Sequence, residues 1–383
     1  MSGGLTLRLG LQQRVFPAYR AVFFDALAAA FDGGLEVFSG DPLPGEALGE
    51  VGTLRLARHA RAVNRHVGRG PLLLYWQPGL TDWLERWQPD VLITEANPRN
   101  LSIAAARRWM HRRGRPVIGW GLGAPPGRNL PERLLSGWRD RHLLGFDALI
   151  SYSQNGAEQF VAAGFPAERI FVAPNAATPR PSGPPPERPA HFREGRPEVL
   201  FVGRLQARKR VDSLLRACAA LPEPLRPGVT IVGDGPERAA FEAAARAVYP
   251  SARFVGAKTG AALEPFYAAA DLFVLPGTGG LAIQQAMSRG LPVLVAEADG
   301  TQGDLVRAGN GWVVPPGDEA ALVKRLEDAL SDAGRLRRMG AESFRIVDEE
   351  VNIDRMVGVF AEVVKILTTE KTEITEGRKE RKS

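Results

Sequence analysis

Short apolar runs alternate with longer segments of helical spacing along almost the whole chain. In the first half, the runs rich in Val, Ile and Leu predict strands at 5–11, 34–38, 71–76, 90–95, 116–120, 147–152 and 169–173. The segments between them predict helices at 17–31, 51–67, 100–113 and 155–163. This alternation is typical of parallel strands joined by crossover helices.

A Pro-rich stretch at 174–197 has no apolar periodicity, so we expect a stiff linker at 179–196. A second series follows it, with predicted strands at 198–202, 229–232, 252–255, 271–275 and 292–296. The predicted helices of this series lie at 210–221, 236–247, 261–269 and 280–289. The pattern predicts an α/β fold of two doubly wound, Rossmann-like domains, 1–178 and 197–350, that face a cleft. Ligands of such sheets bind outside the carboxyl ends of the strands.

The C-terminal residues divide into two segments. Residues 351–367 have the apolar spacing of a helix, whereas 368–383 have almost no apolar content and mixed charge. The first segment therefore predicts a helix, and the second predicts a disordered tail.

Composition narrows the class of protein. The length of 383 residues favours two domains. No run of about 18 apolar residues occurs, which excludes a transmembrane helix. The first residues lack the features of a signal peptide. The one cysteine, Cys218, cannot form an internal disulfide. We therefore expect a cytoplasmic chain.

The net charge of +6 comes mostly from arginine, because only seven of the 49 basic residues are lysine. Arginines crowd the predicted amphipathic helix at 51–69 and the segment RRWMHRRGR at 107–115. Docking to an anionic surface, on the inner membrane face or on a lipid-linked acceptor, is one interpretation. A solvated helix face is the other. No recognised nucleic-acid-binding motif accompanies the basic residues, so a nucleic-acid partner is not favoured.

The end of the predicted strand at 198–202 carries the first chemical signal. In LFVGRLQARKR, Gly203 is followed by Arg204 and, five residues later, by Lys209. A glycine at a strand end allows close backbone approach, and two cations beside it form a site that could hold a diphosphate without a metal. A solvated basic turn is the alternative for this motif alone.

Two further strand ends are rich in glycine. VGDGPER at 232–238 contains Gly233 and Asp234, and LPGTGGL at 275–281 contains Gly277, Thr278, Gly279, Gly280 and Leu281. Backbone N–H groups in such loops suit phosphate or sugar oxygens. Three strand ends of this kind on one sheet are a more specific signal than any one of them.

This ordered series resembles the group 1 (family 4) retaining glycosyltransferases of GT-B fold. FVGRL with a following lysine, VGDGP, FVGAKT, YAAADLFVLP, QAMSRGLPVLVA and NGWVVPPGD occur in the family's order within 198–318. The first half resembles the family more loosely. The resemblance implies sugar transfer from a nucleotide donor to a hydroxyl, without cofactor or metal, and a helix at 351–367 that crosses back to the first domain.

The resemblance also implies roles for single residues. Arg204 and Lys209 would bind the diphosphate and stabilise its developing charge, and Gly256 to Lys258 would lie near the base. The Gly-rich loop would contact the phosphates and the sugar. Two family glutamates are replaced, by Gly277 and Gln285. Gln285 could still bond a ribose hydroxyl, whereas Gly277 puts sugar recognition in doubt.

In the first domain, Glu95 follows a predicted strand and could accept hydrogen bonds from a sugar or act as a base. The alternative is a structural partnership with one of the neighbouring arginines, such as Arg99. Gln12, Gln13 and Arg14 follow the first strand, and Tyr19 and Arg20 open the next helix. We interpret Gln13, Arg14, Tyr19 and Arg20 as acceptor-side candidates. The five histidines have no metal-ligand spacing.

The favoured hypothesis is an active retaining glycosyltransferase that acts on a glycan or lipid-linked acceptor in cell-envelope or polysaccharide assembly. A non-catalytic sugar-nucleotide-binding or scaffold protein is the alternative, because both motif glutamates are missing. The pair Arg204 and Lys209 favours the enzyme. A nucleotide-sugar epimerase would need more acid–base groups than Glu95 provides.

Overall fold

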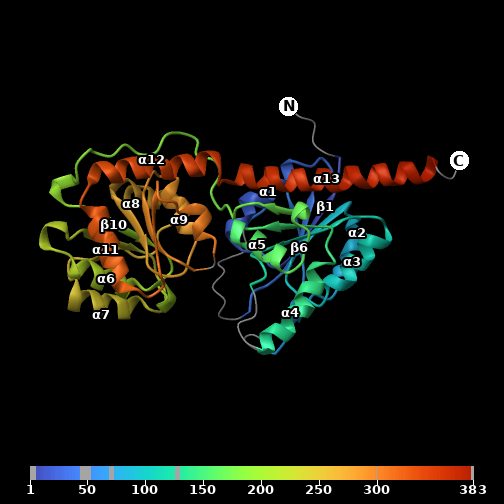
Figure 1. Ribbon diagram of the computed structural model, residues 1–383, viewed down its shortest axis with the longest axis horizontal. Coiled ribbons are helices and arrows are strands. Elements are labelled where there is room, and N and C mark those ends of the chain that lie inside the picture. The colour runs from blue at the N-terminus through green and yellow to red at the C-terminus, as the bar shows by residue number, and fades with distance from the viewer. Residues whose placement is uncertain (1–5, 44–52, 69–72, 126–129, 299, 381–383) are drawn as a thin grey trace. The chain divides into compact units, whose positions relative to one another are not determined.

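Two compact units form the computed structural model, which describes the chain except residues 1–5, 44–52, 69–72, 126–129, 299 and 381–383 (Figure 1). One unit is Met1–Ala177 together with Ile353–Ser383, and the other is Thr178–Asn352. The first will be called the N-terminal unit and the second the C-terminal unit.

The N-terminal unit is built on a seven-stranded parallel sheet of order β3-β2-β1-β6-β7-β8-β9. Its strands are β1 (Leu9–Val15), β2 (Leu35–Gly40), β3 (Arg58–Arg61), β6 (Val91–Glu95), β7 (Val117–Gly121), β8 (Ala148–Ser151) and β9 (Ile170–Val172). A separate antiparallel pair joins β4 (Arg65–Val67) to β5 (Leu74–Trp76).

Successive strand residues of this sheet supply two different cores. Val91 and Ile93 of β6 pack with α1 (Ala21–Ala29) and α13 (Ile353–Glu380), whereas Leu92 packs with α2 (Leu80–Trp87), α3 (Ile103–Arg112) and α5 (Gln154–Ala162) (Figure 1). Because side chains alternate across a strand, both faces of the sheet are buried. The helix α4 (Leu130–Leu143) follows β7.

The C-terminal unit has a six-stranded parallel sheet of order β12-β11-β10-β13-β14-β15. Its strands are β10 (Glu198–Val202), β11 (Gly228–Val232), β12 (Arg253–Phe254), β13 (Leu272–Leu275), β14 (Val293–Ala296) and β15 (Gly311–Val314). Its α-helices are α6 (Val211–Ala220), α7 (Arg238–Val248), α8 (Glu264–Ala269), α9 (Leu281–Met287), α10 (Gln302–Leu305), α11 (Glu319–Leu330) and α12 (Ala333–Glu349). α6 packs against α7 and α11, and α9 packs against α12. The prediction of two doubly wound α/β sheets is confirmed; the cleft stays a prediction.

The predicted helix at 51–67 is wrong for the residues that the structure describes. Arg58–Arg61 is the edge strand β3, and Arg65–Val67 is β4. The carboxylate of Asp25 accepts hydrogen bonds from three successive backbone N–H groups, at Arg55, Leu56 and Ala57 (2.9–3.1 Å). These contacts with a residue of α1 hold the bend at 55–57 that leads into β3.

Two further expectations differ from the structure. The predicted linker is tied to the C-terminal unit, because the Arg188 guanidinium donates to the carbonyls of Ala270 (2.9 Å), Tyr267 (2.8 Å) and Gly290 (3.2 Å). The predicted disordered tail is helical as far as Glu380, since α13 runs from Ile353 to Glu380; residues 381–383 lie outside the described part. Lys and Glu favour helices, and only one glycine interrupts the segment.

Candidate active site

The loop after β10 is held against the loop after β11. The backbone N–H of Gly203 donates to the Val232 carbonyl (3.0 Å), and that of Leu205 donates to the Asp234 carbonyl (2.9 Å). Gly233 has a φ of 153°, and a Cβ there would lie 1.9 Å from the Gly203 carbonyl oxygen. Glycine is therefore required at 233, and it lets the two strand ends meet.

The loop after β13 packs against the same segment. The Thr278 N–H donates to the Arg208 carbonyl (3.1 Å), and a Cβ at Gly277 would lie 2.1 Å from that carbonyl oxygen. The Gln302 amide donates to the Gly279 carbonyl (3.1 Å). The ends of β10, β11 and β13 therefore lie together at the carboxyl edge of one parallel sheet, as the three glycine-rich motifs predict.

The loop after β10 carries four cations, Arg204, Arg208, Lys209 and Arg210. Arg204 is exposed and has no hydrogen-bond or ion-pair partner within the described residues. The Lys209 ammonium donates to the Thr278 carbonyl (2.5 Å), and burial together with the nearby Arg208 lowers the pKa of Lys209 to about 8. The Arg208 guanidinium donates to the side-chain oxygens of Gln206 (3.0 Å) and Thr278 (3.2 Å). All of these partners are neutral.

The loop after β11, which contains Gly233 and Asp234, is stabilised by its own polar groups. The Asp234 carboxylate accepts from the Gly235 N–H (2.7 Å) and pairs with Arg238 (3.1 Å), and these contacts lower the pKa of Asp234. The Gly256 carbonyl accepts from the Gly233 N–H (2.9 Å). Asp234 therefore has a structural role within its loop besides any contact with a ligand.

The remaining residues expected to bind the nucleotide sugar lie on separate elements. Lys258 is exposed on the loop after β12, and Gly280 and Leu281 form the start of α9. The Gln285 side-chain oxygen accepts from the Tyr267 hydroxyl (3.2 Å), so Gln285 has an internal partner as well as a half-buried position.

In the N-terminal unit, Glu95 lies at the end of β6. Its carboxylate oxygens accept from the Arg14 backbone N–H (3.0 Å) and from the Tyr75 hydroxyl (2.5 Å). Burial raises the pKa of Glu95 and of Tyr75. Among the described residues, the Arg99 side chain makes no contact with this carboxylate; the arginine that bonds Glu95 is Arg14, through its backbone N–H.

A buried amide network underlies Glu95. Gln12 and Gln13 are 0% and 5% exposed. The Gln77 amide nitrogen donates to the Gln13 carbonyl (3.0 Å) and to the Asn64 side-chain oxygen (2.9 Å), while Gln12 donates to Gln77 (2.6 Å). The side chain of Gln13 is thus buried, and this segment holds the end of β1 in place.

Tyr19 and Arg20 are adjacent but differ in exposure. Tyr19 is 38% exposed, whereas Arg20 is 2% exposed. The Arg20 guanidinium lies 4.6 Å from the Trp120 ring centroid and 5.4 Å from that of Tyr152, and it donates to the Met356 sulfur on α13 (3.9 Å). The expectation that Arg20 faces an acceptor is therefore wrong, because aromatic rings enclose this cation.

Two family models match successive parts of the chain. The model described as glycosyl transferases group 1 matches residues 186–345, and the glycosyl transferase 4-like domain matches residues 18–176. The chain belongs to the group 1 glycosyltransferases. The resemblance drawn from the motifs is thereby confirmed for both units.

Relatives of known name include group 1 enzymes of actinobacteria. A GDP-mannose-dependent α-mannosyltransferase of Mycolicibacterium smegmatis is 32% identical over 47% of this chain and 48% of its own length. A D-inositol 3-phosphate glycosyltransferase of Nocardia farcinica is 28% identical over 70% of this chain and 59% of its own length. The chain spans about half the length of these curated relatives.

Solved structures share the GT-B fold with this glycosyltransferase chain. Anabaena HepE in complex with UDP has a TM-score of 0.69 at 17% identity and covers 94% of this chain and 99% of its own. Sucrose-phosphate synthase from Thermosynechococcus elongatus has a TM-score of 0.67 at 19% identity, covering 95% and 100%. The GT-B prediction is therefore confirmed.

Two contacts of the candidate residues, one in each unit, are not predicted by the sequence. Arg208 bonds Thr278, and Tyr75 bonds Glu95. The position of Arg208 next to Lys209 was a usable signal for the first contact. Nothing in the sequence distinguished Tyr75 from an ordinary strand residue. No helix in the described part has the length and apolar content needed to span a membrane.

Proposed function

We propose that the chain transfers a glycosyl group from a nucleotide-diphosphate sugar to a hydroxyl of a glycan or lipid-linked acceptor, with retention at the anomeric carbon. The observation that carries this proposal is the group of cations without carboxylate partners beside the Gly-rich loop after β13. Cations without internal counterions suit a diphosphate, because each phosphate supplies a negative charge.

In the proposed mechanism, Arg204 and Lys209 hold the diphosphate and stabilise the charge that develops on it as the glycosidic bond breaks. The acceptor hydroxyl attacks from the face that the leaving diphosphate occupies, and its proton passes to a phosphate oxygen. The N–H groups of the loop Gly277–Gly280 add neutral hydrogen bonds. No metal ion is needed in this scheme.

Glu95 contributes to the acceptor side in this proposal. Its two oxygens already accept from Arg14 and Tyr75, so the carboxylate has a defined orientation and can still accept a further hydrogen bond from a sugar hydroxyl. Burial raises its pKa, while the hydrogen bonds from Tyr75 and Arg14 act in the opposite direction.

A cytoplasmic location with a peripheral contact at the inner membrane face is part of the proposal. Arg108 and Arg112 on α3 are exposed and have no carboxylate partner among the described residues. Such cations fit an anionic headgroup or a lipid-linked acceptor. The names of the relatives suggest GDP-mannose and inositol phosphate as compounds to test.

The first experiment measures thermal stabilisation of the full chain by UDP, GDP, ADP and their sugar derivatives. A ligand at a hundred times its Kd adds about 2.7 kcal/mol to the free energy of unfolding. We expect one base to be preferred and the matching nucleotide sugar to be hydrolysed slowly. A nucleotide that binds without any turnover, with every acceptor tried, would support the scaffold alternative, and no shift with any nucleotide would contradict both.

A further inference from the structure

Arg208 makes its hydrogen bonds to two neutral side chains beside the Gly-rich loop. A guanidinium has five N–H donors, and Arg208 uses two of them, on Gln206 and Thr278. Both acceptors are neutral, and the side chain is exposed. The other N–H donors of Arg208 have no partner within the described residues, so they are available to a ligand bound over Thr278.

The Gly-rich loop itself offers no carboxylate for sugar hydroxyls. Position 277 has no room for a side chain, because a Cβ there would lie 2.1 Å from the Arg208 carbonyl oxygen. In the described part of the chain, the side chains that bond Gly277–Gly280 belong to Arg208, Lys209 and Gln302. Among the described residues, the side chains bonded to this loop are therefore cationic or neutral.

The charges of a nucleotide sugar can be compared with those of the loop after β10. A nucleotide sugar carries one negative charge on each of its two phosphates. Arg204 and Lys209 balance these two charges. Of the other two cations on this loop, Arg210 has the Glu319 carboxylate within electrostatic range, whereas Arg208 lies beside Thr278. A neutral sugar would leave this guanidinium without a counterion, whereas a carboxylate or sulfonate on the sugar would match its planar N–H donors.

We propose that the donor sugar is acidic, a uronic acid or a sulfonated sugar, and that Arg208 recognises its anionic group beside Thr278. This inference rests on the proposed function, because it names the class of donor for the same site. Gly277 contributes by bringing the loop after β13 against Arg208, which places Thr278 within hydrogen-bond distance of the guanidinium. Arg208 is then a specificity-determining residue.

The test compares Kd values by calorimetry at low salt for matched ligands on the full chain. The probes are UDP, UDP-glucose and UDP-glucuronic acid, and GDP, GDP-mannose and GDP-mannuronic acid. We expect the acidic sugar to bind about tenfold more tightly than the neutral sugar of the same base, since a hydrogen bond to a charged group contributes about 1.5–3 kcal/mol. High salt reduces this ratio.

Arg208→Gln is the decisive variant, and Arg246→Gln is its matched control. Arg246 is an exposed arginine of α7 with no partner among the described residues, so its loss changes the net charge equally. Arg208→Gln should abolish the preference for the acidic sugar and change the Kd of the free nucleoside diphosphate by less than about threefold. Arg246→Gln should keep the preference.

Other outcomes overturn the inference or the function separately. Equal affinities for the acidic and neutral sugars would overturn the acidic donor. An Arg208→Gln variant that weakens the free nucleoside diphosphate as much as the acidic sugar would make Arg208 a phosphate ligand instead. Absence of binding by both UDP and GDP would contradict the proposed function itself, whatever the sugar.

Discussion

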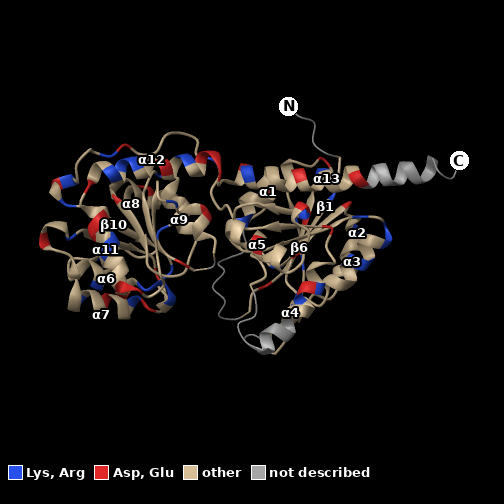
Figure 2. Ribbon diagram, viewed as in Figure 1, with Lys and Arg blue, Asp and Glu red and all other residues tan. Residues whose placement is uncertain are grey.

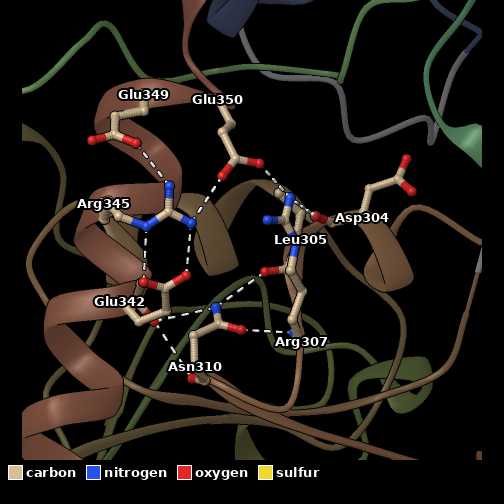
Figure 3. Close-up of polar contacts among 9 residues, drawn as sticks. Asp304, Leu305, Arg307, Asn310, Glu342, Arg345, Glu349 and Glu350 are labelled. Atoms are coloured by element: carbon tan, nitrogen blue, oxygen red, sulfur yellow. Dashed lines mark hydrogen bonds and ion pairs between the residues drawn. The ribbon is translucent and has the colours of Figure 1, made fainter.

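The end of α12 and the loop after β10 place their arginines in two different environments, one with carboxylate partners and one without them among the described residues. Figure 2 shows basic and acidic residues interspersed along α12. Arg345 bonds three carboxylates at 2.7–2.9 Å, those of Glu342, Glu349 and Glu350 (Figure 3). Glu350 also pairs with Arg307 (2.6 Å). In contrast, Arg204, Arg208 and Lys209 have no carboxylate within ion-pair distance among the described residues.

The difference separates stabilising charge from available charge. The ion pairs of α12 are partly exposed, so each contributes little to stability. The cations of these pairs already have carboxylate counterions. Arg208 and Lys209 of the β10 loop bond only carbonyl, amide and hydroxyl oxygens, which an anionic ligand can replace or join without displacing a counterion. Uncompensated cations beside a glycine-rich loop therefore indicate a site more strongly than arginine content does.

Removing one cation from each region tests whether the two groups of cations differ in their effect on catalysis. Arg204→Ala should lower kcat by about a hundredfold or more, because it removes a group that stabilises the developing charge. Arg345→Ala should leave kcat unchanged and affect only stability. The measurement is steady-state transfer with the donor identified by thermal shift. Equal losses in the two variants would show that ion pairing does not distinguish the regions.

The N-terminal unit contains a buried histidine, His142, which has no carboxylate partner among the described residues. Burial, together with Arg107, lowers the pKa of His142 from 6.5 to about 4. The unfolded chain therefore binds this proton first, so the contribution of neutral His142 is complete above pH 6.5 and is lost as the pH falls toward 4. The loss amounts to about 3 kcal/mol of unfolding free energy.

The measurement is urea denaturation of the wild type and of His142→Gln between pH 4 and pH 7. Because other groups titrate in the same window, the difference between the two proteins isolates His142. The wild type should lose stability more steeply than the variant below pH 6.5. Parallel curves would indicate that the pKa of His142 is the same in the folded and the unfolded chain.

Gly277→Ala tests whether close contact between the two loops keeps the cations available. The added Cβ would collide with the Arg208 carbonyl oxygen, and such overpacking costs about 1–3 kcal/mol. We expect the Kd for the nucleoside diphosphate to rise by about tenfold to a hundredfold. Gly183→Ala is the matched control, because a Cβ there meets open space. An unchanged Kd in Gly277→Ala would remove the contact from the account of the site.

The sequence predicted the sheets better than the contacts of the site, for physical reasons. The strand at 198–202 was predicted with its observed bounds, because an uninterrupted apolar run is typical of a strand buried on both faces. The edge strand at 58–61 has no such run, and the bend that leads into it is held by Asp25 of α1. Periodicity could not reveal that long-range contact.

The site shows the same limit. The motifs located Arg204 and Lys209 through spacing within one loop. The environment of Arg208 depends on Thr278, which is 70 residues away, and the orientation of Glu95 depends on Tyr75, which is 20 residues away. Arg20 resembled a surface residue because the aromatic rings around it come from separate elements. Only the fold brings these partners together.

The smallest effect concerns the proton on Lys209. Its pKa of about 8 in the free protein rises when a diphosphate lies beside it, because the anion favours the charged ammonium. Binding above pH 8 must therefore take up a proton, and the Kd should increase by up to about tenfold between pH 7 and pH 9. Lys209→Arg, whose guanidinium does not titrate in this range, should flatten the profile. Calorimetry in buffers of different ionisation enthalpy would detect the proton uptake directly. A wild-type Kd that does not change across this pH range would place Lys209 away from the diphosphate. Arg204 would then be the cation on which diphosphate binding depends.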